Sequence, residues 1–323
     1  MGVWLVDADV LARSRFRLSP LAETVAAFLV LLGRSAAPGQ VTGLAEHREA
    51  FREVLAADPV AAEFARSAAV PHWIADFLCT PPADEDRTFA DELARLRRTP
   101  RRVLLADLAA ARGGREPAGL RIPRLGDRIA EVLAWVWDRM VRPDWPRRAR
   151  AFEADILART SALTTGGWAA ALGGMRPGMR WLGDGELQIN EYANPPRDLS
   201  GATLLFIPAS TGGGWVGWDP PHRYSIVYPC RGLLAPGDPA APAALSRLLG
   251  SGRATILTAL GTPMSTTQLV AVTGLGLGSV GNHLKVLLDA RLVRRDRAGR
   301  SVLYHRTPTG DALVADSAPV RGM

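Results

Sequence analysis

The sequence is poor in the features that mark disulfide-bonded, membrane and secreted proteins. It has only two cysteines, Cys79 and Cys230, which is too few for a disulfide framework. The longest uninterrupted apolar run, Val25–Leu32, is far shorter than the roughly 20 residues that cross a bilayer. The N-terminal stretch GVWLVDADV carries acids where a signal peptide carries basic residues. These absences predict a cytoplasmic protein with no membrane partner.

Lysine is almost missing as well, since 38 of the 39 basic residues are arginines and only Lys285 is a lysine. Arginine-rich usage of this kind is typical of a GC-rich genome. The basic residues are unevenly placed: Leu245–Met323 holds ten basic and four acidic residues, a net of +6 within a total of +7. A basic segment attached to a neutral body favours a polyanionic partner, most often nucleic acid.

The first 234 of the 323 residues divide by their periodicity. Residues 1–170 are mainly helical in pattern, with Ser19-Pro20 placed to open one helix and Leu125–Met140 forming an amphipathic one. Residues 171–234 hold short runs rich in aromatic and β-branched residues, separated by glycine and proline. We therefore expect a helical N-terminal domain and a small antiparallel sheet packed on it. Residues 235–242 (APGDPAAP) predict a linker.

Residues 243–310 predict a winged helix-turn-helix. Ser265–Gln268 reads S-x-x-Q, a capping box at the start of a short helix, and Gly274 is well placed to end it. A second amphipathic helix follows from about Gly278 to Ala290, and Leu292–Tyr304 reads as a hairpin with an arginine-rich tip. Two helices with a glycine-containing turn and then a basic hairpin are typical of DNA-binding domains. The predicted fold is α+β, and residues 311–323 form a tail.

We expect the outward face of the second helix and the hairpin to contact double-stranded DNA. Asn282 could read adenine, and Lys285 could bind guanine or phosphate. Two interior glycines, Gly278 and Gly281, should cost the helix about 2 kcal/mol, so either packing or close approach to DNA must compensate. The sequence leaves open whether Leu277 packs or reaches a thymine methyl group. The predicted DNA-contacting residues are Thr266, Thr267, Gln268, Gly278, Ser279, Gly281, Asn282, His283, Lys285, Arg295, Arg297, Arg300 and Tyr304.

About 65 residues of this region resemble the winged-helix domain of ArsR-type bacterial repressors. The matching stretches are R-x-x-I-L at Arg253–Leu257, N-H-L-K-V-L at Asn282–Leu287, L-V-R-R at Leu292–Arg295 and G-R-x-x-x-Y at Gly299–Tyr304. The residues upstream are similar to an uncharacterised domain found ahead of such winged helices in high-GC bacteria. The resemblance implies a transcriptional regulator, more often a repressor, that acts as a homodimer.

The metal sites of that family are not expected in this chain. Founding members bind metal through a C-x-C motif, where this chain reads Met264–Gln268 (MSTTQ), and zinc sensors use histidine on a terminal helix, where Thr309–Met323 has none. We predict no metal and no cofactor.

Two other functions remain open. An enzyme or small-molecule-binding protein could occupy residues 1–232, with the winged helix as an accessory or autoregulatory module, or the winged helix could dock another protein. No catalytic constellation is visible, so no enzyme is predicted, and an effector stays unidentified. Thr211–Gly214 follows a predicted strand but lacks the lysine and the helix of a phosphate loop, so it reads as a hairpin loop. The scattered tryptophans could line a ligand pocket or form the core.

Overall fold

The computed structural model describes residues 2–35, 44–70, 73–192, 194–230, 241–261, 263–298 and 301–317. The chain divides into two compact units: unit 1 comprises Met1–Pro146 and Gly173–Pro229, and unit 2 comprises Arg147–Leu172 and Cys230–Met323. Helices and small sheets occur together, which confirms the predicted α+β class.

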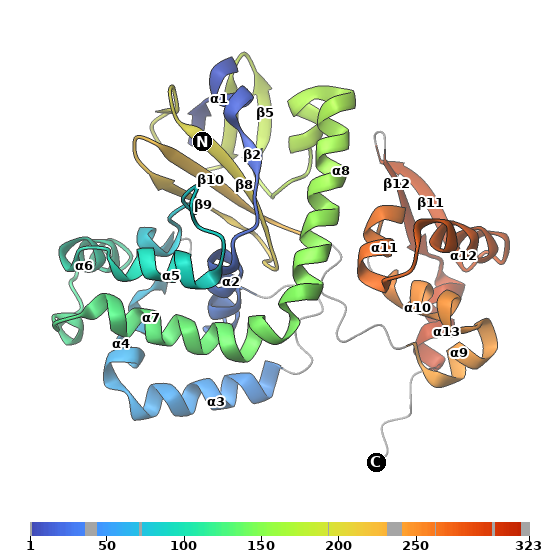
Figure 1. Cartoon of the computed structure of the whole chain (residues 1–323), viewed down its shortest axis with the longest axis horizontal. Coiled ribbons are helices and arrows are strands. Elements are labelled where there is room, and N and C mark those ends of the chain that lie inside the picture. The colour runs from blue at the N-terminus through green and yellow to red at the C-terminus, as the bar shows by residue number, and fades with distance from the viewer. Residues whose placement is uncertain are drawn as a thin grey trace. The chain divides into compact units, whose positions relative to one another are not determined.

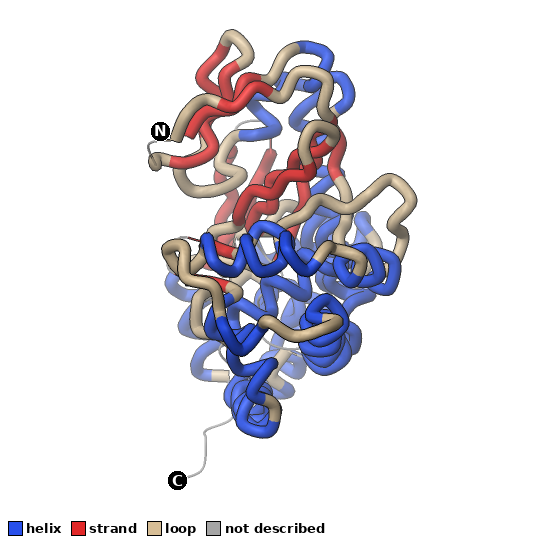
Figure 2. The backbone as a smooth tube through the Cα atoms, turned by 90° about the vertical axis from the view of Figure 1, so that its left-hand side faces the viewer, coloured by secondary structure: helices blue, strands red, loops and turns tan. Residues whose placement is uncertain are grey.

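In unit 1 most of the helices gather at one end, and the larger sheets lie at the other together with the short helix Ala8–Arg13 (Figures 1 and 2). The central helix is α2, all of whose residues are buried. It begins where predicted, because Ser19 Oγ accepts a hydrogen bond from the Ala22 N–H at 3.0 Å and Pro20 occupies the first turn. The α-helices of this unit are α1 (Ala8–Arg13), α2 (Pro20–Leu31), α3 (Leu44–Ala57), α4 (Pro59–Ser67), α5 (Phe89–Arg97), α6 (Arg101–Ala110) and α7 (Leu125–Val136).

The sheets of unit 1 differ from the predicted antiparallel sheet of residues 171–234. One has the strand order β5-β6-β1-β7 and the other β2-β8-β10-β9, so β1 and β2 come from the region predicted to be helical. Both are mixed, because β1 runs parallel to β7 and β8 runs parallel to both β2 and β10. The strands are β1 (Gly2–Leu5), β2 (Arg15–Phe16), β5 (Arg180–Gly183), β6 (Glu186–Asn190), β7 (Arg197–Asp198), β8 (Thr203–Ala209), β9 (Trp215–Asp219) and β10 (Arg223–Pro229), and a separate hairpin joins β3 (Ala69–Val70) and β4 (Trp73–Ile74).

The tryptophans near the end of α7 pack in the core rather than line a pocket. Trp137 stacks on Phe89 with ring centroids 4.5 Å apart and meets Trp145 at 5.6 Å. Both tryptophans pack against the main hydrophobic core of unit 1.

One long helix closes the region of residues 1–170 that was predicted to be helical, and it extends past that region. It is α8, Trp145–Leu172, and it is interrupted at Gly167, whose φ is 67° and ψ is −171°. Its residues 147–172 belong to unit 2.

The rest of unit 2 has a small core of its own, formed by side chains such as Leu257, Leu269, Val280, Leu284 and Leu287. Around it lie α9 (Ala243–Leu249), α10 (Ser251–Ala259), α11 (Thr266–Thr273), α12 (Leu277–Asp289), the antiparallel hairpin β11 (Val293–Ala298) and β12 (Ser301–Arg306), and α13 (Pro308–Asp316). The predicted tail therefore begins inside a helix. Of the predicted linker, only Ala241 and Pro242 are described.

Candidate nucleic-acid interface

The turn between α11 and α12 is built by local hydrogen bonds that the sequence encodes. Ser265 Oγ accepts from the Gln268 N–H at 3.3 Å, and Gln268 Oε1 accepts from the Ser265 N–H at 2.8 Å, which completes the predicted capping box. Gly274 ends α11 with a φ of +70°, a left-handed conformation that favours glycine. The chain then enters α12 at Leu277, three residues later.

The second helix, α12, has two sharply different faces. Val280, Leu284 and Leu287 are buried in the core of unit 2. The opposite face is exposed along its length, since residues at i, i+3, i+4 and i+7 share one side of a helix. The exposed residues that were predicted to contact DNA are Gly278, Ser279, Gly281, Asn282 and Lys285.

Packing does not require either glycine of α12, Gly278 in the first turn or Gly281 one turn later. A Cβ placed on Gly278 or on Gly281 would meet no atom within 4 Å, and neither residue has a positive φ. An alanine would therefore fit at both positions and would favour the helix by about 1 kcal/mol at Gly281, and by less at Gly278 in the first turn. The buried face of α12 packs in the core of unit 2, so packing compensates for the glycines, and the glycines leave the backbone of the exposed face accessible.

Two polar side chains on the same face, those of Asn282 and Lys285, have no partner within the described part of the chain. Neither Asn282 nor Lys285 makes a side-chain hydrogen bond or ion pair there, and both are exposed. An exposed amide and ammonium held by a rigid helix are suited to bind base edges or phosphates.

His283 lies at the boundary between the two faces. Its Nε2 is 3.2 Å from Ser279 Oγ, one helical turn earlier. The ring also covers Gly252 of α10, where an added Cβ would approach Nε2 to 2.5 Å. His283 therefore packs between helices and engages Ser279, which leaves both less available to a ligand than Asn282 or Lys285.

The hairpin presents fewer unpaired cations than its sequence suggested. Arg294 pairs with Asp296 at 2.7 Å, and His305 Nε2 is 3.3 Å from the same carboxylate. Arg295 is exposed and has no ion-pair partner among the described residues. The side chain of Arg297 and the whole of Arg300 lie outside the described residues.

The remaining predicted contact residues are less exposed. Thr266, Thr267 and Gln268 are half-buried in the first turn of α11, where the Gln268 carbonyl is already used in the capping box. Tyr304 is half-buried and packs against the core, and its backbone pairs with Met264.

Leu277 is an exposed apolar residue that the sequence could not place. Its side chain is 63% exposed at the start of α12. As the first residue of the helix, it has no helical neighbour on the N-terminal side to define its face, so periodicity could not decide. The structure places it at the N-terminal end of α12, where recognition helices approach base edges.

No family model, curated protein or solved structure matches this chain. Within the described ranges no helix is long and apolar enough to cross a membrane, and no group of three or more His, Cys, Asp or Glu side chains is placed to hold a metal ion.

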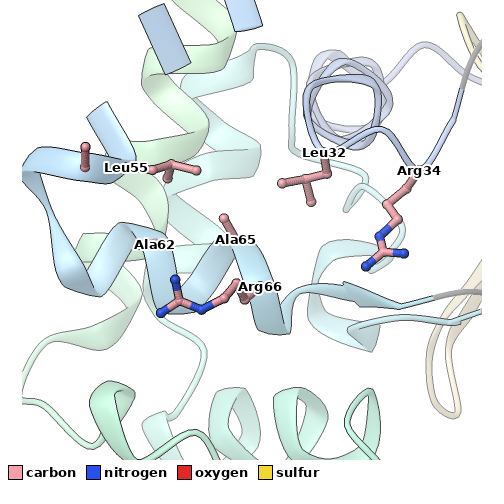
Figure 3. Close-up of a pocket in the computed structure, with 7 residues that line it drawn as sticks. Leu32, Arg34, Leu55, Ala62, Ala65 and Arg66 are labelled. Atoms are coloured by element: carbon pink, nitrogen blue, oxygen red, sulfur yellow. The ribbon is translucent and has the colours of Figure 1, made fainter. Parts of the chain in front are cut away.

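Unit 1 has an open pocket of about 360 Å³ where the end of α2 meets α3 and α4. Leu32 and Leu55 point toward each other across it, with Ala65 between them (Figure 3). Arg66 at its rim is mostly exposed and pairs with Glu63 at 2.7 Å. Arg34 also lines the pocket, at the end of α2, and no ion pair neutralises it within the described residues.

Proposed function

We propose that residues 243–310 form a winged helix-turn-helix that binds DNA, and that the chain is a sequence-specific transcriptional regulator, a repressor of the ArsR type. The observation that carries this proposal is the exposed face of α12. That face has glycines that the fold does not need, and it presents Asn282 and Lys285, which have no partner among the described residues. No metal sensing and no catalysis are part of the proposal, and the regulator acts in the cytoplasm.

The mode of binding follows from the dimensions of DNA. The major groove is about 12 Å wide and admits one helix. With α12 in the groove, Asn282 can make a bidentate contact to adenine, and Lys285 can donate to a phosphate or to guanine. Glycine at positions 278 and 281 lets the helix backbone come close to the DNA. Arg295 on β11 then contacts the phosphate backbone.

We further propose that the protein binds as a homodimer. One winged helix reads only a few base pairs, so specificity needs two half-sites about 34 Å apart. Residues 1–232 should contribute to the dimer contact. Light scattering should show twice the mass of the chain at micromolar concentration, and a monomer with and without DNA would contradict this.

The experiment is selection of bound sequences from a random DNA library with the full-length protein, followed by affinity measurements at several salt concentrations. Wild-type affinity should fall steeply with salt, because neutralised phosphates release counterions. Lys285→Ala should weaken binding by about 1–3 kcal/mol if Lys285 reads a base, or lower the salt slope by about one if it holds a phosphate.

The matched control is Arg247→Ala, which removes an exposed cation from α9, away from the proposed recognition face. Its affinity should match that of the wild type. If Lys285→Ala behaves like this control, or if wild-type binding is absent or insensitive to salt, the proposed function is wrong.

A further inference from the structure

Arg176, in the segment that leads from α8 to β5, is a half-buried residue whose guanidinium has no counterion in the described part of the chain. Its Nε and Nη1 are buried and have no hydrogen-bond partner there. Its Nη2 reaches only the Gly214 carbonyl oxygen, at 3.5 Å. Burial lowers the pKa of the guanidinium, yet an arginine keeps its proton in proteins. Because an unpaired buried charge is costly, this side chain calls for an anion.

The loop that Arg176 contacts, Ser210–Gly214, is not the hairpin loop that the sequence predicted. It joins β8 to β9, and these strands lie on opposite sides of β10. The loop therefore starts at the carboxyl end of β8, and the parallel strand β10 ends beside it, where Pro229 pairs with Ala209. Carboxyl ends of parallel strands are a common place for ligands to bind.

Gly214 holds this loop tightly against the sheet. Its φ is +70°, and a Cβ there would lie 2.1 Å from the Val227 carbonyl oxygen. No larger residue can occupy this position without moving the backbone. At the other end of the loop, the Ser210 N–H donates to the Glu23 carboxylate at 2.7 Å. The loop is thus anchored at both ends.

Between these anchors the hydrogen-bond donors of the loop make only long hydrogen bonds. The Gly212 N–H is 3.3 Å from Ser35 Oγ, and the Gly214 N–H is 3.5 Å from Thr211 Oγ1. The two hydroxyls, of Ser35 and Thr211, are also 3.5 Å apart. All these distances are at the long limit for hydrogen bonds. A buried guanidinium, amides and two hydroxyls therefore lie together with hydrogen-bonding capacity to spare.

We propose that Arg176 and the loop Ser210–Gly214 bind a tetrahedral oxyanion: inorganic phosphate, or the phosphate group of a larger molecule. The anion supplies the missing counterion of Arg176 and accepts hydrogen bonds from Thr211 and the glycine amides. This site gives unit 1 a ligand of defined chemistry, and it does not depend on the proposed DNA binding.

The test is thermal unfolding of the full-length protein as sodium phosphate replaces sodium chloride at constant ionic strength. The wild-type midpoint should rise with the logarithm of the phosphate concentration. Arg176→Met should abolish this response without lowering the midpoint in chloride, because it removes a buried charge that has no partner. Thr211→Val should weaken phosphate binding about tenfold, the effect of one hydrogen bond. Arg98→Met, which removes an exposed arginine from unit 1, should respond like the wild type.

A parallel titration with methyl phosphate distinguishes the two sources of the ligand. Tighter binding of the ester indicates a phosphorylated molecule, and binding of inorganic phosphate alone indicates a closed site for the free ion. Either outcome supports the proposal. If Arg176→Met does not fold, Arg176→Lys keeps the charge but lacks the guanidinium fork, and calorimetry should show at least tenfold weaker phosphate binding.

The proposal would be overturned if the wild type responded to neither phosphate. It would also be overturned if Arg176→Met responded as the wild type does, or if Arg176→Lys bound phosphate with unchanged affinity. A third contradicting result is a phosphate response that appears only after Asp238 is replaced, in Asp238→Asn. Asp238 is the only side-chain carboxylate outside the described residues, so the last result would identify an internal counterion. Lys285→Ala should keep the full phosphate response, so this proposal and the proposed function can fail separately.

Discussion

Glycines in the two units serve opposite purposes. In the sheet of unit 1, a Cβ on Gly217 would lie 1.7 Å from the Cys79 carbonyl oxygen, so the fold requires glycine there. On α12 of unit 2, Gly278 and Gly281 face open space and the fold would accept alanine. A residue that destabilises a helix without serving its packing points to a role outside the fold.

Charged residues show the same contrast. Glu92 in unit 1 is buried and accepts hydrogen bonds from Ser19 Oγ at 2.7 Å and from the Leu21 N–H at 2.9 Å. Lys285 in unit 2 is exposed and has no partner among the described residues. The Glu92 carboxylate is used inside the fold of unit 1, whereas α12 leaves the Lys285 ammonium available. Four variants test this difference.

The largest effect should come from Gly217→Ala. Its Cβ would overlap the backbone of Cys79, and backbone cannot move aside as a flexible side chain can. We expect the free energy of unfolding of unit 1 to fall by about 3 kcal/mol or more, measured by denaturant titration. A variant as stable as the wild type would show that the close contact between β9 and Cys79 is not required.

Glu92 should make unit 1 less stable as the pH rises. Burial raises the pKa of its carboxyl to about 7 from the ordinary value of 4.5. The folded state therefore holds a proton that the unfolded state releases, and stability falls as the pH rises from about 4.5 through 7. The loss should be at most about 3 kcal/mol. Glu92→Gln keeps both hydrogen-bond acceptances and should flatten this part of the profile; an unchanged profile would assign the dependence to other groups.

The double substitution Gly278→Ala/Gly281→Ala should separate stability from binding. Unit 2 should become more stable by about 1–2 kcal/mol, because one glycine leaves the helix interior and the other its first turn. Affinity for the selected DNA should fall at least tenfold, because two methyl groups then stand between the helix and the groove. Thermal unfolding and a DNA-binding titration on the same sample measure both. A double variant that is more stable and binds equally well would remove the main support for the proposed function.

Local patterns predicted the helices better than the sheets. The capping box at Ser265–Gln268 and the Ser19-Pro20 helix start depend on neighbours within a few residues, so their positions could be read from the sequence. The position of strand β1 could not be read in this way, because its four residues pair with β6, which lies near the other end of the sequence of unit 1. The sequence runs that form β8, β9 and β10 were predicted as strands. Their order in the sheet was not predicted, because strands that follow one another in sequence are expected to lie side by side, whereas β10 lies between β8 and β9.

The candidate site shows the same limit. Periodicity identified the exposed face of α12, since every third or fourth residue shares a side. It could not show that Ser279 engages His283 or that Asp296 pairs with Arg294. It also missed Arg176, because a single arginine in a glycine-rich segment gives no sign of burial.

The smallest effect, and the most specific, should come from Leu277→Ala. Leu277 is 63% exposed, so its loss should leave the stability of unit 2 nearly unchanged. If the side chain covers a thymine methyl group, DNA affinity should fall by about 1 kcal/mol, and preference for thymine at one operator position should relax. The matched control is Leu248→Ala on α9, where an equally exposed leucine (67%) lies off the proposed interface. Equal losses in both variants would mean that Leu277 contributes only a general apolar surface, whereas a loss confined to Leu277→Ala and to thymine-containing sites would place the N-terminal end of α12 against the bases.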